Sequence, residues 1–199
     1  MIPVALQPEP EGFDEKVRQK GSSWLRGKGL SASSTLPDGE SLQSYWRACL
    51  DDLHHAYKGV CAYLSVYIER VLGAGTVDHF VPKSRSLGLA YEWRNYRLAC
   101  SRMNSRKRDY ETVLDPFDLD ESPFHLELVT GKIYPKPFLP PALTASALAT
   151  IERLGLDDAD CREMRTRHFD ECWRGDVSPA YLSRVSPFVY QEARRQGLL

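Results

Sequence analysis

Apolar residues recur at intervals of three and four positions in the stretch LQSYWRACLDDLHHAY, within residues 41–57. This period places them on one face of an α-helix, and the Lys58-Gly59 pair that follows is typical of a helix end. Residues 12–25 predict a shorter helix, and the Gly-, Ser- and Pro-rich stretch 26–40 predicts a loop. The first forty residues have too few apolar positions to fold alone, so we expect them to pack on the rest; the alternative is an arm that binds a partner.

The segment VCAYLSVYI at 60–68 is rich in β-branched and aromatic residues and predicts a strand. Gly73-Ala74-Gly75 predicts a turn, and residues 76–81 predict a second strand, antiparallel to the first and ended by Pro82. Residues 83–96 then predict a loop that folds back over this hairpin. Residues 98–110 predict a helix, so the order of elements is strand, strand, helix.

Alternating apolar and polar residues at 122–134 predict a second hairpin, with Thr130-Gly131 in its turn. The stretch PKPFLPP at 135–141 predicts a stiff linker. Helices are expected at 143–154 and at 157–173, the latter capped by Asp157. The pairs Ser178-Pro179 and Ser186-Pro187 each combine a capping residue with proline at the first helical position, and predict two more helices.

These elements predict an α+β protein in three parts: an N-terminal arm at 1–40 packed on the core, a core at 41–113, and a hairpin with C-terminal helices at 114–199. We expect the last part to form one compact unit with the core. A chain of 199 residues with 42% hydrophobic residues is adequate for such a fold. We expect no membrane span and no signal peptide, and therefore a cytoplasmic location.

The candidate chemistry lies between residues 77 and 109. An acidic residue and a histidine are adjacent, Asp78-His79, and two amide side chains follow at Asn95 and Asn104. A carboxylate and an amide oxygen suit one hard divalent cation such as Mg²⁺, and a histidine can act as a general base near neutral pH. Neighbouring residues of a strand point to opposite faces, so a local twist or bulge is needed to bring Asp78 and His79 to one site.

The order Asp-His, Asn, then Asn-x-x-Lys resembles the motif of the HNH (ββα-metal) endonuclease family. It is similar to the HNH domain of RNA-guided CRISPR effectors and to stand-alone bacterial HNH nucleases, some of them from anti-phage defence systems. The resemblance covers about residues 60–109. The last residue of the family's motif is often histidine, and here it is Asn104. The resemblance implies a ββα-metal core. It also implies Asp78 and Asn104 as ligands of Mg²⁺ or Mn²⁺, His79 as general base, Asn95 as the residue that pins the loop, and Lys107 near the scissile phosphate.

Many HNH proteins hold a structural zinc with two CxxC pairs. Here the corresponding positions read Cys61-Ala62-Tyr63-Leu64 and Cys100-Ser101-Arg102-Met103, so each pair has lost one cysteine. Two thiolates do not complete a four-ligand zinc site, and we expect no structural zinc. Leu64 and Met103 are expected to pack where the metal would be. The odd number of cysteines, five, predicts reduced thiols.

The net charge of −1 conceals an asymmetry. Residues 83–108 contain eight basic residues and one acidic residue, a charge of +7, so the remainder carries −8. A positive segment around the motif suits a phosphodiester substrate. The residues expected to bind nucleic acid are Lys83, Arg85, Arg97, Arg102, Arg106 and Arg108.

Two functions follow. The first is a metal-dependent DNA endonuclease that nicks one strand per site, in bacterial defence if the resemblance extends that far, with an ATPase or sensor protein from the same operon as a partner. The second is an HNH-derived module that binds nucleic acid or protein without turnover. The motif contacts phosphate and metal, so an RNA substrate is a third and weaker alternative. The presence of a histidine where a general base is needed favours the enzyme, because binding alone requires no base.

Overall fold

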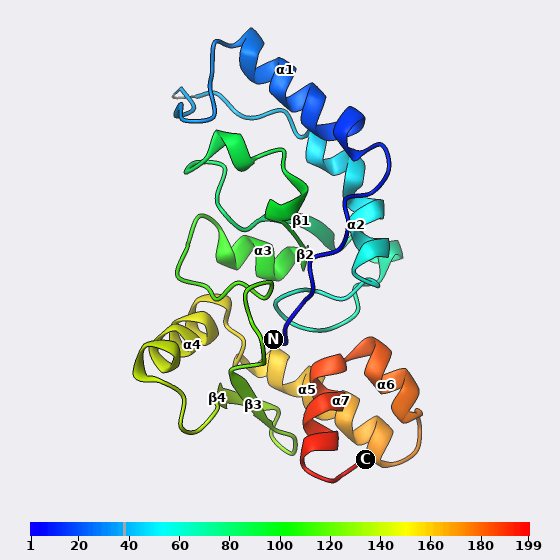
Figure 1. The fold of residues 1–199 in the computed structure, drawn as a ribbon. Coiled ribbons are helices and arrows are strands. Elements are labelled where there is room, and N and C mark those ends of the chain that lie inside the picture. The colour runs from blue at the N-terminus through cyan, green and yellow to red at the C-terminus, as the bar shows by residue number, and fades with distance from the viewer. Residues whose placement is uncertain (38) are drawn as a thin grey trace. The chain divides into compact units, whose positions relative to one another are not determined.

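The computed structural model describes residues 1–37 and 39–199, and it is an α+β fold (Figure 1). The chain divides into two compact units. We call Leu6–Gly59 with Glu69–Glu111 the N-terminal unit, and Met1–Ala5 with Val60–Ile68 and Thr112–Leu199 the C-terminal unit. Among the described residues, no helix is long and apolar enough to cross a membrane.

The N-terminal unit contains the candidate chemistry. A π-helical turn at Asp14–Arg18 leads into α1, and a 3₁₀ turn at Tyr45–Cys49 leads into α2. Further 3₁₀ turns lie at Arg70–Leu72, Leu87–Leu89 and Trp93–Asn95. The helices and strands are α1 (Gln19–Gly27), α2 (Leu50–Ala56), β1 (Gly75–His79), β2 (Tyr96–Cys100) and α3 (Ser101–Lys107).

Strands β1 and β2 form an antiparallel pair whose register runs without interruption from Gly75↔Cys100 to His79↔Tyr96. The expected hairpin of residues 60–68 with 76–81 is therefore wrong, because β1 pairs with a strand on the far side of the loop 80–95. The predicted helix 98–110 is shorter, since its first residues belong to β2. The order strand, strand, helix remains, and α3 contacts both strands.

Residues 60–68 form a tight turn in the C-terminal unit instead of a strand. Ser65 has a positive φ of 56°, and its N–H donates to the carbonyl of Cys61 at 2.8 Å. Only Val60 and Tyr67 pair as an isolated bridge. The β-branched and aromatic residues of this segment are used for burial, since Tyr63 is fully enclosed.

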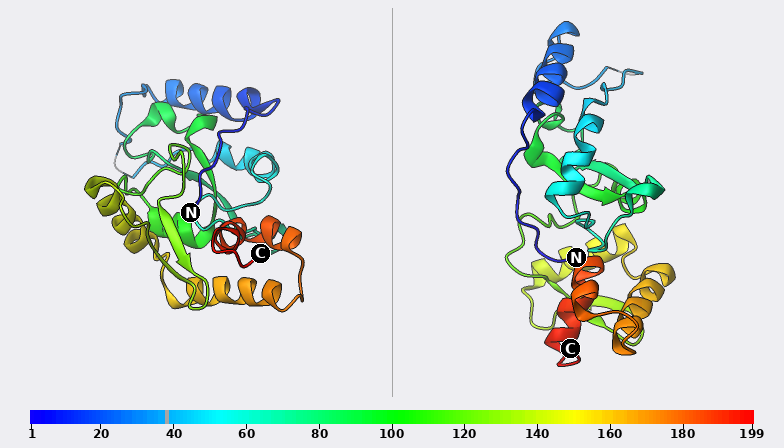
Figure 2. Two further views of the ribbon diagram at one scale, coloured as in Figure 1. Left: turned by 60° about the horizontal axis from the view of Figure 1, so that its bottom comes forward. Right: turned by 90° about the vertical axis from the view of Figure 1, so that its right-hand side faces the viewer.

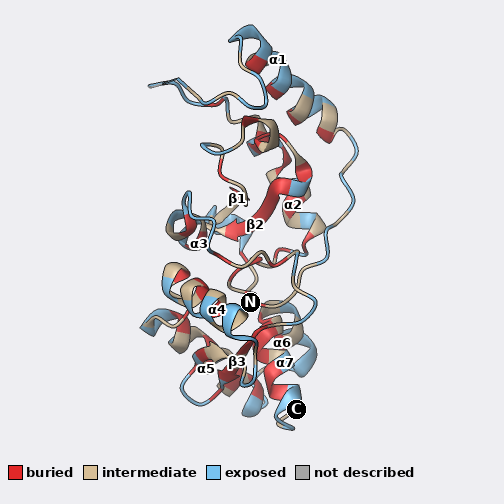
Figure 3. Cartoon of the chain, turned by 60° about the vertical axis from the view of Figure 1, so that its left-hand side comes forward, coloured by how far each residue is buried: buried red, intermediate tan, exposed pale blue. Residues whose placement is uncertain are grey.

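The N-terminal arm packs on the strands of its own unit through Phe13. This ring is fully buried and makes edge contacts with Trp93 at 5.5 Å and Tyr96 at 5.8 Å between ring centroids. The indole N–H of Trp93 donates to the carbonyl of Gln7 at 2.8 Å. Helix α1 lies against the Tyr91 ring at Gly21, where any larger side chain would overlap that ring. Burial along β2 is nearly complete (Figure 3).

The C-terminal unit confirms the second hairpin and the helices that follow it. Its elements are β3 (Phe124–Glu127), β4 (Lys132–Pro135), α4 (Pro141–Leu154), α5 (Ala159–Trp173), α6 (Pro179–Val185) and α7 (Pro187–Arg195), and the last three helices contact one another (Figure 2). Ser178 caps α6 by accepting the N–H of Tyr181, as expected. Asp157 does not cap α5, because its carboxylate accepts the N–H of Ile133 and pairs with Arg162.

Candidate functional site

Helix α3 brings Asn104 against β1. The amide Nδ2 of Asn104 donates to Thr76 Oγ1 at 3.1 Å, and the Thr76 hydroxyl donates to the carbonyl of Ala99 at 2.8 Å. Thr76 and Asp78 are two positions apart in β1, so they share the face of the strand that α3 covers. The hydrogen bond to Thr76 fixes which end of the Asn104 amide is the nitrogen. Its Oδ1 is left without a hydrogen-bond donor among the described residues.

Lys107, on the last turn of α3, is completely buried. Its ammonium donates to the carbonyls of His79 and Phe80, both at 2.9 Å, and lies 3.4 Å from Asp78 Oδ2. The resemblance places Lys107 near a scissile phosphate, and in this structure its ammonium is enclosed. It ties the end of β1 to α3.

His79 lies on the opposite face of β1. Its ring meets Trp46 and Tyr96 edge-on, with centroids 4.8 and 5.0 Å apart, and the residue keeps 6% of its surface exposed. Nε2 lies 2.9 Å from the carbonyl of Ala90, which can only accept, so Nε2 carries the proton of the neutral ring. Nδ1 is then the basic nitrogen, and it has no hydrogen-bond donor among residues 1–37 and 39–199.

The pKa of His79 is lowered to about 3, first by burial, which disfavours the charged ring, and then by the Lys83 ammonium. The bond to Ala90 opposes this change, and Lys107 adds to it. His79 is therefore neutral at pH 7, the protonation state a general base needs.

Asn95 holds the loop that carries Ala90. The side chain is buried, its Oδ1 accepts the N–H of Val81 at 2.8 Å, and its Nδ2 donates to the carbonyls of Val81 and Leu89, both at 3.0 Å. The Tyr96 hydroxyl also donates to the carbonyl of Ala90, at 2.9 Å. The partner of His79 Nε2 is thus fixed by two side chains, one at the end of the loop and one at the start of β2.

No bulge brings Asp78 and His79 to one face. The regular register directs Asp78 toward α3 and His79 toward Trp46. Lys83, at the exit of β1, is within electrostatic range of both: after burial, its ammonium is the next cause that lowers the pKa of His79, and the carboxylates of Asp109 and then Asp78 raise the pKa of Lys83 against burial. Burial has the largest effect on the pKa of Lys83 and lowers it.

The basic residues do not form one exposed patch. Arg97 is buried, its guanidinium donates to the carbonyls of Arg94 and Tyr96 and lies over the Phe80 ring, so its expected contact with nucleic acid is not supported. Lys83 is half-buried, with its ammonium 4.4 Å from the centre of the Trp46 ring. The remaining residues predicted to bind nucleic acid are half-buried or exposed: Arg85, Arg102, Arg106 and Arg108.

Cys61 and Cys100 belong to different units. The Sγ of Cys61 accepts the N–H of Leu64 at 3.4 Å within a tight turn, and Met103 is fully buried in α3. Among the described residues, no three His, Cys, Asp or Glu side chains gather as a metal site would require.

Sequence reasoning missed Thr76, Trp46 and Ala90. Thr76 has a recognisable signal, because it precedes Asp78 by two positions and so shares its face of a strand. Trp46 and Ala90 have none, since their contacts with His79 arise from segments distant in sequence. No protein-family model matches the chain, and no curated protein sequence matches it.

Proposed function

We propose that the chain is a metal-dependent endonuclease of the HNH type, which hydrolyses phosphodiester bonds in DNA. The observation that carries this proposal is the return of α3 to the Asp78 face of β1, with Asn104 held there by Thr76. This places a carboxylate and an oriented amide on one side of an antiparallel strand pair. On its other side lies a neutral histidine that a pinned loop orients.

The donor set fits a hard divalent cation. Asp78 and the Oδ1 of Asn104, which accepts no hydrogen bond from residues 1–37 or 39–199, would hold Mg²⁺ or Mn²⁺, with water completing the shell, because Mg²⁺ takes few protein ligands. A bound ion would supply Lewis-acid stabilisation of the phosphate and of the leaving oxygen.

We assign His79 to proton removal from the attacking water. Because its ring lies on the face of β1 opposite Asp78, this role requires the end of β1 to twist when DNA binds, so that Nδ1 reaches the metal-bound side. Nε2–H is committed to Ala90, so Nδ1 accepts the proton. A ring of pKa about 3 is a weak base, but a substrate phosphate nearby favours the protonated ring and raises that pKa. Lys107 holds the backbone carbonyl of His79 and so fixes the strand end from which the ring projects.

The test is metal dependence of cleavage and of binding. Supercoiled plasmid is incubated with protein over a range of Mn²⁺ concentrations, with chelator as the blank, and Mn²⁺ binding is followed separately by electron paramagnetic resonance. Asp78→Ala and Asn104→Ala should each move both midpoints to higher Mn²⁺. Unchanged midpoints in both variants would remove these residues from the metal site.

The second candidate, a binding module without turnover, is favoured by one observation. The buried ammonium of Lys107 already compensates Asp78, as it would in a site that no longer needs a metal. Such a module would bind nucleic acid equally well with chelator and with Mn²⁺, and would leave the plasmid supercoiled. The two candidates are therefore separated by the same experiment.

A further inference from the structure

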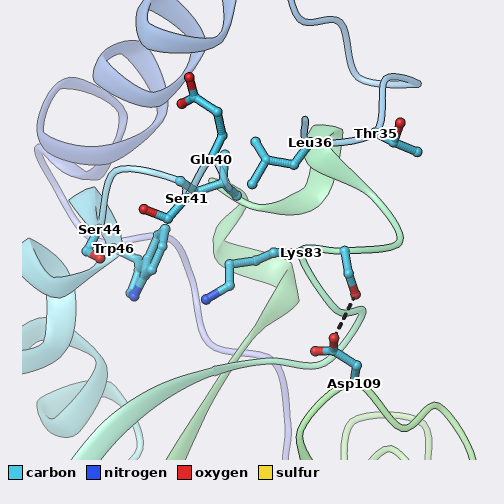
Figure 4. A pocket seen from close by; sticks show the side chains of 10 residues that line it. Thr35, Leu36, Glu40, Ser41, Ser44, Trp46, Lys83 and Asp109 are labelled. Carbon is cyan, nitrogen blue, oxygen red and sulfur yellow. Dashed lines mark hydrogen bonds between the residues drawn. The ribbon is translucent and has the colours of Figure 1, made fainter. Parts of the chain in front are cut away.

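A pocket of about 480 Å³ lies within the N-terminal unit. Its walls include Leu42, Trp46, Lys83 and Asp109, and the Lys83 side chain extends toward Trp46 (Figure 4). The Trp46 indole that lines the pocket also meets the His79 ring, with centroids 4.8 Å apart. The pocket is therefore separated from the proposed general base by one aromatic side chain.

The charges of the pocket argue against a phosphate as its occupant. Two carboxylates line it, Glu40 and Asp109, against one ammonium, Lys83. Glu40 pairs with Lys28 at 2.8 Å, and Asp109 accepts the Ser84 hydroxyl at 3.0 Å, the dashed line in Figure 4. An apolar and aromatic wall with acceptor oxygens at its rim suits a flat, uncharged ring that carries N–H donors.

We propose that this pocket binds one unpaired nucleobase of the DNA strand that is cut, a proposal that rests on the endonuclease function and defines its substrate. The volume suits a single nucleotide, in the range of small-ligand sites, and is far too small for a duplex. The base stacks on Trp46 in the place where the Lys83 ammonium now lies, 4.4 Å from the ring centre. Lys83 then turns to the phosphate of the same nucleotide.

The acceptor rim gives a base preference. The Asp109 carboxylate accepts from exocyclic amino groups, which cytosine, adenine and guanine carry and thymine lacks. The preferred substrate is thus DNA with an unpaired, amino-bearing base, as at a bulge, a flap or a single-stranded segment.

Binding of fluorescent duplexes measured by anisotropy in calcium tests this. A duplex with one bulged cytosine is compared with the fully paired duplex. Stacking of one base predicts about 5- to 150-fold tighter binding of the bulged duplex. Ser41→Trp, which fills the pocket from its exposed rim, should abolish that preference, and Ser23→Trp on the exposed face of α1 should retain it. Asp109→Asn should reduce the advantage of bulged cytosine over bulged thymine.

The outcomes separate this proposal from the endonuclease itself. Plasmid cleavage by a wild-type protein that binds both duplexes equally would overturn the pocket and leave the function standing. A bulge preference that Ser41→Trp removes, without cleavage in any metal, would support the pocket and refute the enzyme. A preference that survives in Ser41→Trp would place the base elsewhere and overturn the pocket.

Discussion

Replacing Lys107 with methionine removes a buried cation from the junction of β1 and α3. The side chain has no exposed surface, and its ammonium serves three oxygens: two backbone carbonyls at 2.9 Å and Asp78 Oδ2 at 3.4 Å. Methionine fills a similar volume but donates nothing. The variant therefore leaves the Asp78 carboxylate, itself only 3% exposed, without its ammonium partner.

The expected loss of stability is large for a single substitution. Breaking a buried ion pair by removing one partner costs about 3–5 kcal/mol, because the remaining charge stays out of water. The lost hydrogen bonds to the carbonyls of His79 and Phe80 add to this loss of stability if water does not replace the ammonium. Asp78→Asn in the same chain removes the buried negative charge that Lys107 compensates. The double variant should therefore be more stable than the sum of the two single losses predicts, by about 1–3 kcal/mol.

The assay is urea unfolding followed by tryptophan fluorescence, which reports mainly on the N-terminal unit because Trp24, Trp46 and Trp93 lie there. Lys28→Met is the matched control, since the Lys28–Glu40 pair is exposed and should contribute about 1 kcal/mol or less. Equal losses for Lys107→Met and Lys28→Met would refute the buried ion pair as a structural tie.

Burial lowers the pKa of His79 from 6.5 to about 3, so the unfolded chain binds the proton first as pH falls below 6.5. Between pH 6.5 and 4.5 wild type should thus lose about 2.3 kcal/mol more than His79→Gln, somewhat less than two pH units at about 1.36 each, because the unfolded imidazole is already half protonated at pH 6.5; equal losses of stability for the two proteins in urea unfolding would contradict this. Thr76→Val should weaken Mn²⁺ binding about 10-fold or more by releasing the Asn104 amide, while Thr76→Ser should retain it; equal affinities by electron paramagnetic resonance would exclude the orienting role. Arg108→Glu should flatten the log–log salt dependence of duplex binding by about one unit, and Arg194→Glu on α7 should not; the reverse result would move the DNA to another face.

The elements with local signals were predictable from sequence. The second hairpin has alternation and a Thr130-Gly131 turn, and Ser178 caps α6 as its pairing with proline indicates. The turn at residues 60–68 was not predictable from the sequence. Its β-forming residues give no indication of the positive φ of Ser65, which turns the chain. The pairing of β1 with β2 across a long loop has no turn signal either, and the nearest β-prone segment, 60–68, is the partner that the sequence favours.

The candidate site was predictable in its residue types but not in their surroundings. The basic run that contains Lys107 has the composition of a solvated surface, yet the helical period of α3 turns this one side chain inward. Arg97 is drawn inward by alternation in β2, directly opposite Asp78 in the register. Whether a charged side chain is buried depends on which distant segments pack over it. Neither the motif nor the charge of the neighbouring residues predicts that packing.

We propose His79 as the base of a metal-dependent nuclease. Its most direct test is conversion of supercoiled plasmid to the nicked form by wild type and by His79→Ala, with Mg²⁺ or Mn²⁺ and with chelator, after circular dichroism has confirmed that both proteins are folded. Wild type should nick the plasmid in a metal-dependent manner, and the variant should nick it at a rate about 10²–10⁴-fold lower. Equal nicking by the two proteins, or no nicking by wild type in either metal, would contradict this assignment.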